Sequence, residues 1–555
     1  MKNLRELVLR YALQNAVFYN GKASPGAVLG KVVSDSPELR KKIDEVRKEI
    51  EAVIKEVNSL GPEKQKEMLK KAHPEMLQRE EKKQEELPAL PGAKQGGFAT
   101  RFAPSPTGPL NLGHLLRPVM LPYLYAKKYG GIFILRFEDT DAKKIKKEYY
   151  GMIMEDLMST GVKWDKLVKE SDHMDIFYRH AEEMLKSGRA YVCTCPAEDF
   201  KNLKEKKKDC PCRARSAAAN LKDWGNMLKG SYKEGGAVVR LKTSMSDPNP
   251  TFRDPPLLRV ETAPHPIKGT RYKVWPLYNF ANVVEDHYSG ITHVFRGKEH
   301  EHNTAIQKII YDFFGWKMPE VVNFGMVYLP GTKLHTRDMV EMIRNGEARG
   351  WDDPKLPTVR ALLRRGFQPD ALRKFATVCS ISKTDIRVGW ENMEGINRKL
   401  IDSLSNRYMV VADPVRISVK GAPPVREAKE DLHPDFPARG KKTMPVDLDE
   451  IYLSKEDFSS FRGKTIRLKG LGNIRLDKIS HYENNEIVAG MPKMQWVSKP
   501  NMKVEILTPA GKLSGLGEIN MKNLKIGALV QMERIGFGRI DDITPKKITV
   551  CFAHK

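Results

Sequence analysis

A stretch rich in proline and glycine, residues 101–114 (RFAPSPTGPLNLGH), carries the residue types of a nucleotide site. Residues 98–102 before it have the composition of a short strand, and residues 115–129 after it that of a helix interrupted by prolines. A strand, a tight turn and a helix commonly begin a nucleotide-binding α/β unit, where the helix amides attract anions. Gly113 lacks a Cβ and lets a flat base approach the backbone, and His114 can donate hydrogen bonds to phosphate oxygens. The pattern therefore predicts a nucleotide site at this turn.

Charged residues also end two apolar runs further along the chain. Residues 131–137 suit a strand buried in a parallel sheet, and Glu138 and Asp141 follow them. A second run of apolar and β-branched residues ends in Arg296. Because parallel strands bring their carboxyl ends to one edge of a sheet, where ligands bind, we expect Glu138 and Arg296 to face the same site. The alternatives are a carboxylate that caps the next helix and a structural salt bridge for Arg296.

Four of the six cysteines form two Cys-x-Cys pairs, and these pairs predict a metal site. Two such pairs can place four thiolates around one tetrahedral ion, for which Zn²⁺ is the natural candidate. The ligands would be Cys193, Cys195, Cys210 and Cys212. Reduced thiols without a metal are the alternative. So few cysteines in 555 residues do not describe a disulfide framework, and they favour a reducing, cytoplasmic location.

The composition indicates a multidomain protein with a polyanionic partner. The chain has 555 residues and a formal net charge of +25, which suits nucleic acid because neutralised phosphates release counterions. A generally basic, solvated surface is the alternative. No run approaches the roughly 20 apolar residues of a membrane span, and no signal peptide begins the chain, so we expect no membrane association.

The string at residues 101–114 resembles the HIGH signature of class I aminoacyl-tRNA synthetases, in the form that glutamyl-tRNA synthetases carry. Asn111 stands where that signature has its first histidine. Residues 136–141 (RFEDTD) resemble the family's RxEDTD motif, residues 275–281 (WPLYNFA) its PxYxxA motif, and residues 290–300 (GITHVFRGKEH) its GxTHVIRGxEH motif. The β-rich C-terminal part resembles the archaeal and eukaryotic glutamyl enzymes and the glutaminyl enzymes, in which paired barrels read the anticodon.

This resemblance implies a ligase that joins L-glutamate to tRNA-Glu through a glutamyl-adenylate, with ATP and Mg²⁺. In that family Glu138 would hold the ammonium group of the amino acid, and Arg296 with Arg101 its side-chain carboxylate. The implied catalytic residues are His114, Lys333 and Arg337. The implied ATP contacts are Pro104, Gly113, His114, Glu299 and Leu334. The implied substrate contacts are Arg101, Ser105, Glu138, Tyr278 and Arg296.

The loop at residues 333–337 (KLHTR) resembles the family's KMSKS loop but departs from it. Thr336 occupies the fourth position, where the family has lysine, so Lys333 and Arg337 are the available cations. Lysine and arginine are not interchangeable at a phosphate site. A tRNA-binding paralogue with impaired catalysis would explain the departure. Four intact residues argue against that alternative: Arg101, His114, Glu138 and Arg296.

A glutaminyl-tRNA synthetase is the nearest alternative function. That family resembles this chain but has a small neutral residue in place of Arg296. It also shows PEPNG where this chain has residues 104–108 (PSPTG), and DDTN where this chain has residues 138–141 (EDTD). All three differences favour glutamate, because a buried carboxylate is best matched by a bidentate arginine. Use of tRNA-Gln as a second acceptor stays open.

Apolar residues at helical spacing near the N-terminus predict a helix with one apolar face: Ile43, Val46, Ile50, Val53, Ile54 and Val57. This helix belongs to the first of six predicted parts of the chain. The parts are an N-terminal helical domain and linker (1–97), the first half of a Rossmann-like α/β catalytic domain (98–188), an inserted acceptor-binding domain with the cysteines (189–271), the second catalytic half (272–345), a helical stem-contact domain (346–412) and all-β anticodon-binding barrels (413–555). We expect a monomer whose N-terminal helices are available to a protein partner.

Overall fold

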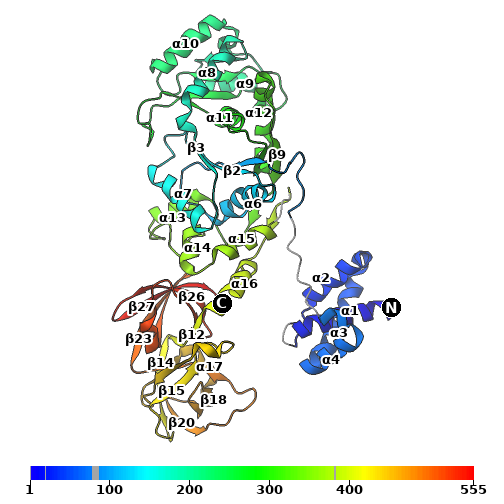
Figure 1. Cartoon of the computed structure of the whole chain (residues 1–555), viewed down its shortest axis with the longest axis vertical. Coiled ribbons are helices and arrows are strands. Elements are labelled where there is room, and N and C mark those ends of the chain that lie inside the picture. The colour runs from blue at the N-terminus through cyan, green and yellow to red at the C-terminus, as the bar shows by residue number, and fades with distance from the viewer. Residues whose placement is uncertain (1, 19–20, 78–86, 380–382) are drawn as a thin grey trace. The chain divides into compact units, whose positions relative to one another are not determined.

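The structure is a computed structural model that describes residues 2–18, 21–77, 87–379 and 383–555 (Figure 1). The chain divides into two compact units, Met1–Glu86 and Leu87–Lys555. The division falls before the predicted boundary at residue 97. In the described ranges, none of the helices combines the length and the apolar character needed to cross a bilayer.

The first unit is a small helical bundle. Its helices are α1 (Lys2–Phe18), α2 (Pro25–Asp35), α3 (Ile43–Ser59) and α4 (Pro62–Ala72). The predicted stripe on α3 is buried from Val46 to Val57 in one core with Val8 and Ala12 of α1, and Ile43 at its start is partly exposed. Gln65 is fully buried, and its amide donates to the carbonyl oxygens of Val57 at 2.8 Å and of Gly21 and Leu60 at 3.0 Å. The bond to Leu60 reaches the C-cap of α3, and the bond to Gly21 ties this end of the helix to the segment that follows α1.

Five parallel strands form the centre of the second unit. They are β1 (Ala99–Phe102), β2 (Ile132–Phe137), β3 (Lys166–Lys169), β8 (His293–Gly297) and β9 (Glu320–Phe324). The ladders β1–β2, β2–β3 and β8–β9 are all parallel. The N–H of Thr292 donates to the carbonyl of Ala99 at 2.9 Å, which places β8 beside β1 and joins the two halves of the fold. The predicted Rossmann-like α/β arrangement is therefore confirmed.

Helices cover this sheet and carry part of the site (Figure 1). They are α5 (Leu112–His114), η3 (Leu115–Val119), α6 (Met120–Lys128), α7 (Lys147–Ser159), α11 (Tyr278–Tyr288) and α12 (Glu301–Phe314). The apolar side chains of β2, among them Phe133, Leu135 and Phe137, are buried between them. An apolar strand buried on both faces is what a parallel sheet requires.

Residues 87–97, which the sequence predicts as a linker, pack on the catalytic part. The N–H of Leu90 donates to the hydroxyl of Tyr129 at 3.1 Å. The Nε2 atom of His293 lies 2.9 Å from the carbonyl oxygen of Pro91. His293 belongs to the GITHVFRGKEH motif, and in the fold it anchors this segment rather than facing a ligand.

An antiparallel sheet with its own helices interrupts the catalytic fold. Its strands are β4 (Ala190–Cys193), β5 (Val238–Leu241), β6 (Pro256–Val260) and β7 (Val274–Pro276). The accompanying helices are α8 (Met174–Lys186), α9 (Ala197–Glu205) and α10 (Ala217–Lys229). Because β7 pairs with β6, this sheet continues past residue 271, the predicted end of the insertion. Its core also includes Phe280 of α11 and Ile306 of α12.

A helical region follows the catalytic sheet. It contains α13 (Thr336–Arg344), α14 (Val359–Arg365), α15 (Pro369–Val378) and α16 (Trp390–Ile401). Two short strands, β10 (Val327–Tyr328) and β11 (Ile386–Arg387), pair in parallel and connect this region to the end of the catalytic sheet.

The C-terminal part is built of two seven-stranded sheets and a hairpin. The first sheet has the order β12 (Asn406–Tyr408), β25 (Leu529–Met532), β26 (Gly536–Ile543), β27 (Lys547–His554), β23 (Asn501–Thr508), β24 (Gly511–Glu518) and β13 (Val410–Ala412). The second has the order β21 (Lys493–Met494), β18 (Thr465–Leu468), β19 (Gly472–Arg475), β20 (Ile479–Asn484), β14 (Pro414–Lys420), β17 (Ile451–Ser454) and β22 (Val497–Ser498). The hairpin is β15 (Glu427–Asp431) with β16 (Lys441–Pro445), and α17 (Lys455–Phe461) follows β17. This architecture confirms the predicted all-β end of the chain.

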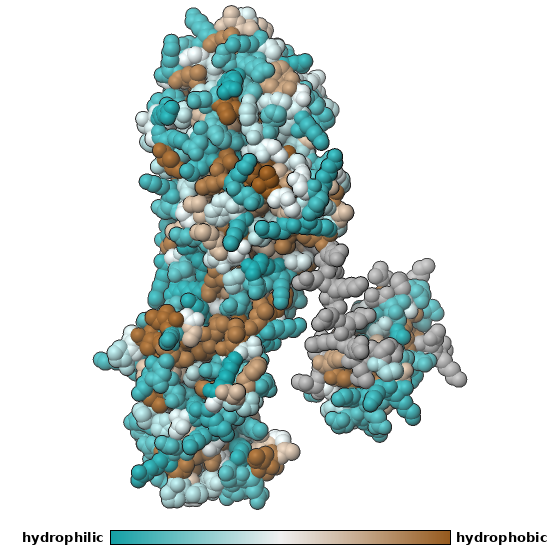
Figure 2. Space-filling model, viewed as in Figure 1, coloured by the Kyte–Doolittle hydropathy of each residue, from teal (hydrophilic) through white to brown (hydrophobic). Residues whose placement is uncertain are grey.

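The visible surface is largely hydrophilic (Figure 2). Its broadest apolar patch on this face lies near β26 and β27. The polar surface accords with a composition that is 30% charged.

Candidate active site

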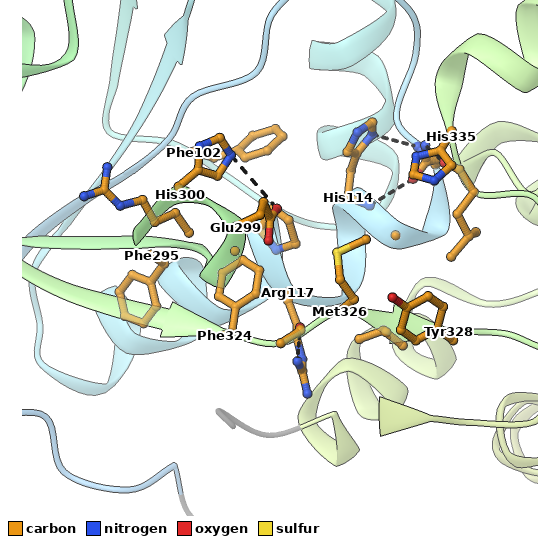
Figure 3. Close-up of a pocket in the computed structure, with 18 of the residues that line it drawn as sticks. Phe102, His114, Arg117, Phe295, Glu299, His300, Phe324, Met326, Tyr328 and His335 are labelled. Atoms are coloured by element: carbon orange, nitrogen blue, oxygen red, sulfur yellow. Dashed lines mark hydrogen bonds and ion pairs between the residues drawn. The ribbon is translucent and has the colours of Figure 1, made fainter. Parts of the chain in front are cut away.

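A cavity of about 670 Å³ lies at the carboxyl end of β1, β2 and β8. Most residues predicted for the site line it: Arg101, Gly113, His114, Glu138, Tyr278, Arg296, Glu299, Lys333 and Leu334. Three predicted residues are not part of the lining: Pro104, Ser105 and Arg337. Figure 3 shows His114 and His335 toward one end of the cavity, and Glu299 and His300 toward the other. The cavity therefore lies at the edge of the parallel sheet, where the sequence predicts the ligand site.

The turn before α5 determines which ring nitrogen of His114 carries the proton. The side chain of Asn111 accepts a hydrogen bond from the His114 N–H at 2.9 Å, and the Asn111 N–H donates to Nδ1 of His114 at 3.4 Å. With Nδ1 as an acceptor, the ring proton of a neutral imidazole sits on Nε2. Burial lowers the pKa of His114 to about 4. At neutral pH His114 therefore offers one hydrogen-bond donor and no positive charge.

Two polar residues of α11 that lie outside the sequence motifs, Asn282 and Asp286, organise the other end of the cavity. The amide of Asn282 donates to Oε1 of Glu138 at 2.9 Å. The Oδ1 atom of Asn282 accepts bonds from Arg101 at 2.8 Å and Arg136 at 2.7 Å. Burial raises the pKa of Glu138, and the charges of Arg136 and Arg101 oppose that rise. Asn282 thus holds Glu138 in place and leaves it facing the cavity.

Asp286, one turn further along α11, is shared by two arginines. Its Oδ1 atom lies 2.9 Å from Nε of Arg101 and 2.6 Å from Nη1 of Arg136. The charge of Arg101 is therefore already balanced inside the protein, although the side chain lines the cavity. Tyr278, Asn282 and Asp286 follow one another at i, i+4 and i+8, so the signal available in the sequence was three polar residues on one face of this helix.

Arg296 differs from Arg101 because its neighbours are neutral. Its Nη1 donates to Oε1 of Gln307 at 2.9 Å and its Nη2 to Oγ1 of Thr304 at 2.5 Å. The side chain is 6% exposed. Within the described ranges, no carboxylate oxygen lies within 4.0 Å of this guanidinium. Two neutral groups orient the guanidinium at the cavity wall, and its charge remains available to a ligand.

The loop after β10 brings Lys333 and Leu334 to the cavity, and α13 begins directly after it at Thr336. Leu334 covers Gly113: a Cβ at Gly113 would lie 3.6 Å from the Cβ of Leu334. Arg337 lies in the first turn of α13, outside the lining. Lys333 is therefore the loop cation that reaches the cavity.

The four predicted cysteines come together in the inserted domain. The Sγ atoms of Cys193 and Cys210 are 3.9 Å apart, those of Cys195 and Cys212 are 3.7 Å apart, and all four lie within 4.8 Å of one another. A tetrahedral zinc with Zn–S distances of about 2.3 Å requires sulfur separations of about 3.8 Å. The cluster therefore has the shape of a closed four-thiolate site, and it lies outside the active-site cavity.

Comparison with known proteins places the whole chain in one family. The family model of class I tRNA synthetases (E and Q), catalytic domain, matches residues 98–403, and the model of their anticodon-binding domain matches residues 405–493. The glutamate–tRNA ligase of Pyrococcus furiosus is 43% identical, and those of Thermococcus kodakarensis and Methanothermobacter thermautotrophicus are 41% and 39% identical, each over the full length of both chains. A glutamate-tRNA synthetase structure from Elizabethkingia anophelis overlaps 56% of this chain and 71% of its own, at 22% identity and a TM-score of 0.41. From the family models and the full-length relatives, the chain belongs to the class I tRNA synthetases for glutamate and glutamine.

Proposed function

We propose that this protein ligates L-glutamate to tRNA-Glu with ATP, through a glutamyl-adenylate. The observation that carries the choice of glutamate is Arg296, a buried guanidinium on the cavity wall whose two neighbours, Thr304 and Gln307, are neutral. A buried cation without an anion is costly, and the side-chain carboxylate of glutamate would supply the missing charge. The neutral amide of glutamine would not.

In this proposal the side chains position and neutralise the reactants. Glu138, held by Asn282, would bind the ammonium group, and Arg296 the distal carboxylate. The substrate α-carboxylate then attacks the α-phosphorus of ATP in line, and pyrophosphate leaves. The Nε2–H of His114 and the ammonium of Lys333 would donate to the phosphate oxygens as charge develops. Positioning and charge neutralisation account for most catalysis of this kind.

Mg²⁺ would enter this site with ATP rather than through a cage of protein ligands. The groups of histidine, cysteine and acidic residues able to hold a metal in the described part of the chain lie outside the cavity lining. Mg²⁺ normally binds substrate phosphates and keeps several waters. Its contribution would be neutralisation of phosphate charge.

We expect ATP–pyrophosphate exchange in the presence of tRNA to depend on glutamate. The expected preference over glutamine is about 30-fold or more, because glutamine leaves the buried charge of Arg296 unpaired. Exchange should be measured with each amino acid, with and without tRNA-Glu, and charging then tested on tRNA-Glu and tRNA-Gln. Equal exchange with both amino acids, or none with either, would contradict the proposal.

The tRNA would extend from the inserted domain to the C-terminal sheets. The family match over residues 405–493 and the net charge of +25 support this placement. Phosphate contacts dominate such binding, so affinity for tRNA should fall steeply with salt.

We also propose that Cys193, Cys195, Cys210 and Cys212 hold one structural Zn²⁺. The N–H of Thr194 donates to Sγ of Cys212 at 3.4 Å, a contact that favours a thiolate. A four-thiolate site is closed to substrates, so its contribution would be to shape the inserted domain.

Reduced protein should contain about one equivalent of zinc, because four thiolates leave no open coordination position. Cys210→Ser should lower the content to about half or less, measured by elemental analysis after dialysis. Cys379→Ser, a buried cysteine outside the cluster, is the matched control and should retain the metal. Zinc below about half an equivalent in the wild type, or unchanged content in Cys210→Ser, would refute the site.

A further inference from the structure

The segment between β10 and α13, residues 329–335, is here called the Lys333 loop, and it has little hydrogen bonding of its own. Within the described residues its internal backbone bonding is one turn, in which the N–H of Thr332 donates to the carbonyl of Leu329 at 3.1 Å. Segments of this kind open locally at low free-energy cost. What keeps Lys333 in the cavity must therefore come from outside the loop.

Asn111 provides one such attachment. Its amide Nδ2 donates to the carbonyl oxygen of Leu334 at 2.7 Å. The same side chain accepts from the His114 N–H through Oδ1, so the two ends of one amide serve two elements. Asn111 stands where the HIGH signature has histidine, and a departure from the family motif thus makes the contact between the two nucleotide-binding segments.

The backbone that carries Asn111 is fixed on both sides. The N–H of Leu112 donates to the carbonyl of Pro357, and the N–H of Val359 donates to the carbonyl of Leu110, both at 2.9 Å. The N–H of Leu110 also donates to the buried carboxylate of Asp156 at 2.9 Å. A loop with little internal bonding is therefore attached to a turn whose backbone is fixed on both sides.

Two further contacts also hold the Lys333 loop and the start of α13 in place. A Cβ at Gly108 would lie 2.7 Å from Cγ2 of Thr336, so the threonine that replaces the family's lysine packs closely on the turn. On the other side, the indole N–H of Trp390 donates to Oγ1 of Thr332 at 2.8 Å. Trp390 is the first residue of α16 and belongs to the helical region.

We infer that Asn111 is a positioning residue that holds the Lys333 loop closed over the nucleotide site, with Trp390 as a second attachment. Through Leu334 the bond keeps Lys333 directed into the cavity, where its ammonium would meet the phosphates of ATP. This inference rests on the proposed adenylation reaction. Its alternative is that Asn111 is only the cap of α5 and that its contact with Leu334 is incidental.

Asn111→Ser separates the two readings. Serine is as good an N-cap as asparagine, so the hydrogen bond to the His114 N–H is kept, but its hydroxyl does not reach Leu334. The matched control is Asn249→Ser. Asn249 caps the short helix η6 (Pro250–Phe252) in the inserted domain, where its Oδ1 accepts from the N–H of Thr251 at 2.9 Å.

With tRNA present, Asn111→Ser should raise the KM for ATP or lower kcat in pyrophosphate exchange, together by about 3- to 10-fold, as expected for one neutral hydrogen bond. The KM for glutamate and the melting temperature should stay at wild-type values. Trypsin cleavage after Lys333, followed by mass spectrometry, should accelerate by a similar factor. Trp390→Phe, which removes the N–H donor and keeps an aromatic ring, should act in the same direction, and Asn249→Ser should change neither measurement.

Wild-type ATP kinetics and wild-type cleavage in Asn111→Ser would overturn the inference, and so would faster adenylation. A fall in melting temperature with cleavage accelerated at many sites would show that Asn111 is only a cap. The cleavage assay needs no catalysis, so it tests the attachment even if the wild-type enzyme does not activate glutamate. A wild-type enzyme that does not activate glutamate would refute the proposed function and leave the attachment of the loop to be judged by the cleavage assay.

Discussion

Replacing Arg296 with alanine is expected to lower kcat/KM for glutamate by about 30- to several thousand-fold. The reason is that the substrate carboxylate would enter a buried site and find no cation there. Losing one partner of a buried charge pair costs on the order of 2–5 kcal/mol. The structure strengthens this expectation, because Arg296 donates to the neutral Thr304 and Gln307, and no carboxylate of the described residues pairs with it that the substitution would leave unpaired.

Glutamine is the internal control for this variant. Its side chain is neutral, so pyrophosphate exchange with glutamine should fall far less, and the preference between the two amino acids should narrow or invert. Arg296→Lys should be intermediate, since it keeps the charge but loses the planar fork that binds a carboxylate through two bonds. Wild-type kinetics with glutamate, or equal losses for glutamate and ATP, would show that Arg296 does not select the substrate.

Arg101 is the less informative position for the same test. Its Nε is 2.9 Å from the carboxylate of Asp286, so Arg101→Ala would remove part of a buried network as well as a cavity wall. Any loss of glutamate activation in that variant would combine substrate binding with the stability of the fold.

Asp286→Ala is expected to lower the free energy of unfolding by about 3–5 kcal/mol, the usual cost of removing one partner from a buried ion pair. Asp286 is 4% exposed and lies 2.9 Å and 2.6 Å from the guanidinium groups of Arg101 and Arg136. Without it, two buried cations lose their nearest anion. Activation of glutamate should fall as well, because Arg101 and Arg136 also hold the Asn282 amide that orients Glu138. Urea unfolding followed by tryptophan fluorescence measures the first effect.

The pH dependence of this loss has a defined sign. Burial alone would raise the pKa of Asp286, but the charges and hydrogen bonds of Arg101 and Arg136 outweigh it and lower the pKa. Stability from a carboxylate with a lowered pKa is present above the ordinary aspartate range and is lost as the pH falls through the lowered value. The difference between the wild type and Asp286→Ala should therefore be full at pH 7 and shrink in acid.

An exposed ion pair on the neighbouring helix gives the matched control. Lys308 and Asp312 of α12 are 2.8 Å apart, and both side chains are 62% exposed. Asp312→Ala should change the free energy of unfolding by less than about 1 kcal/mol, because solvent screens such pairs. If Asp286→Ala proved as mild as Asp312→Ala, the buried network would not contribute to stability as argued.

The motifs in the sequence were sufficient to predict the family, the multidomain architecture and the reaction. Residues 101–114, Glu138 and Arg296 could be expected at one sheet edge because each directly follows or ends an apolar strand, and the structure brings them to one cavity. The four cysteines could be grouped for a similar reason, since each pair is fixed by a spacing of two residues.

The partners of these residues were decided only by the tertiary structure. Asp286 lies 185 positions from Arg101 and 150 from Arg136, and the amide of Asn111 meets a carbonyl 223 positions away. Spacing in a sequence determines which side chains share a face of one helix or strand, but not which face another element will meet. The strength of a buried charge pair depends on separations of a few ångströms and on the exclusion of water. Whether Arg101 or Arg296 keeps its charge available to a substrate is therefore decided only when the chain has folded.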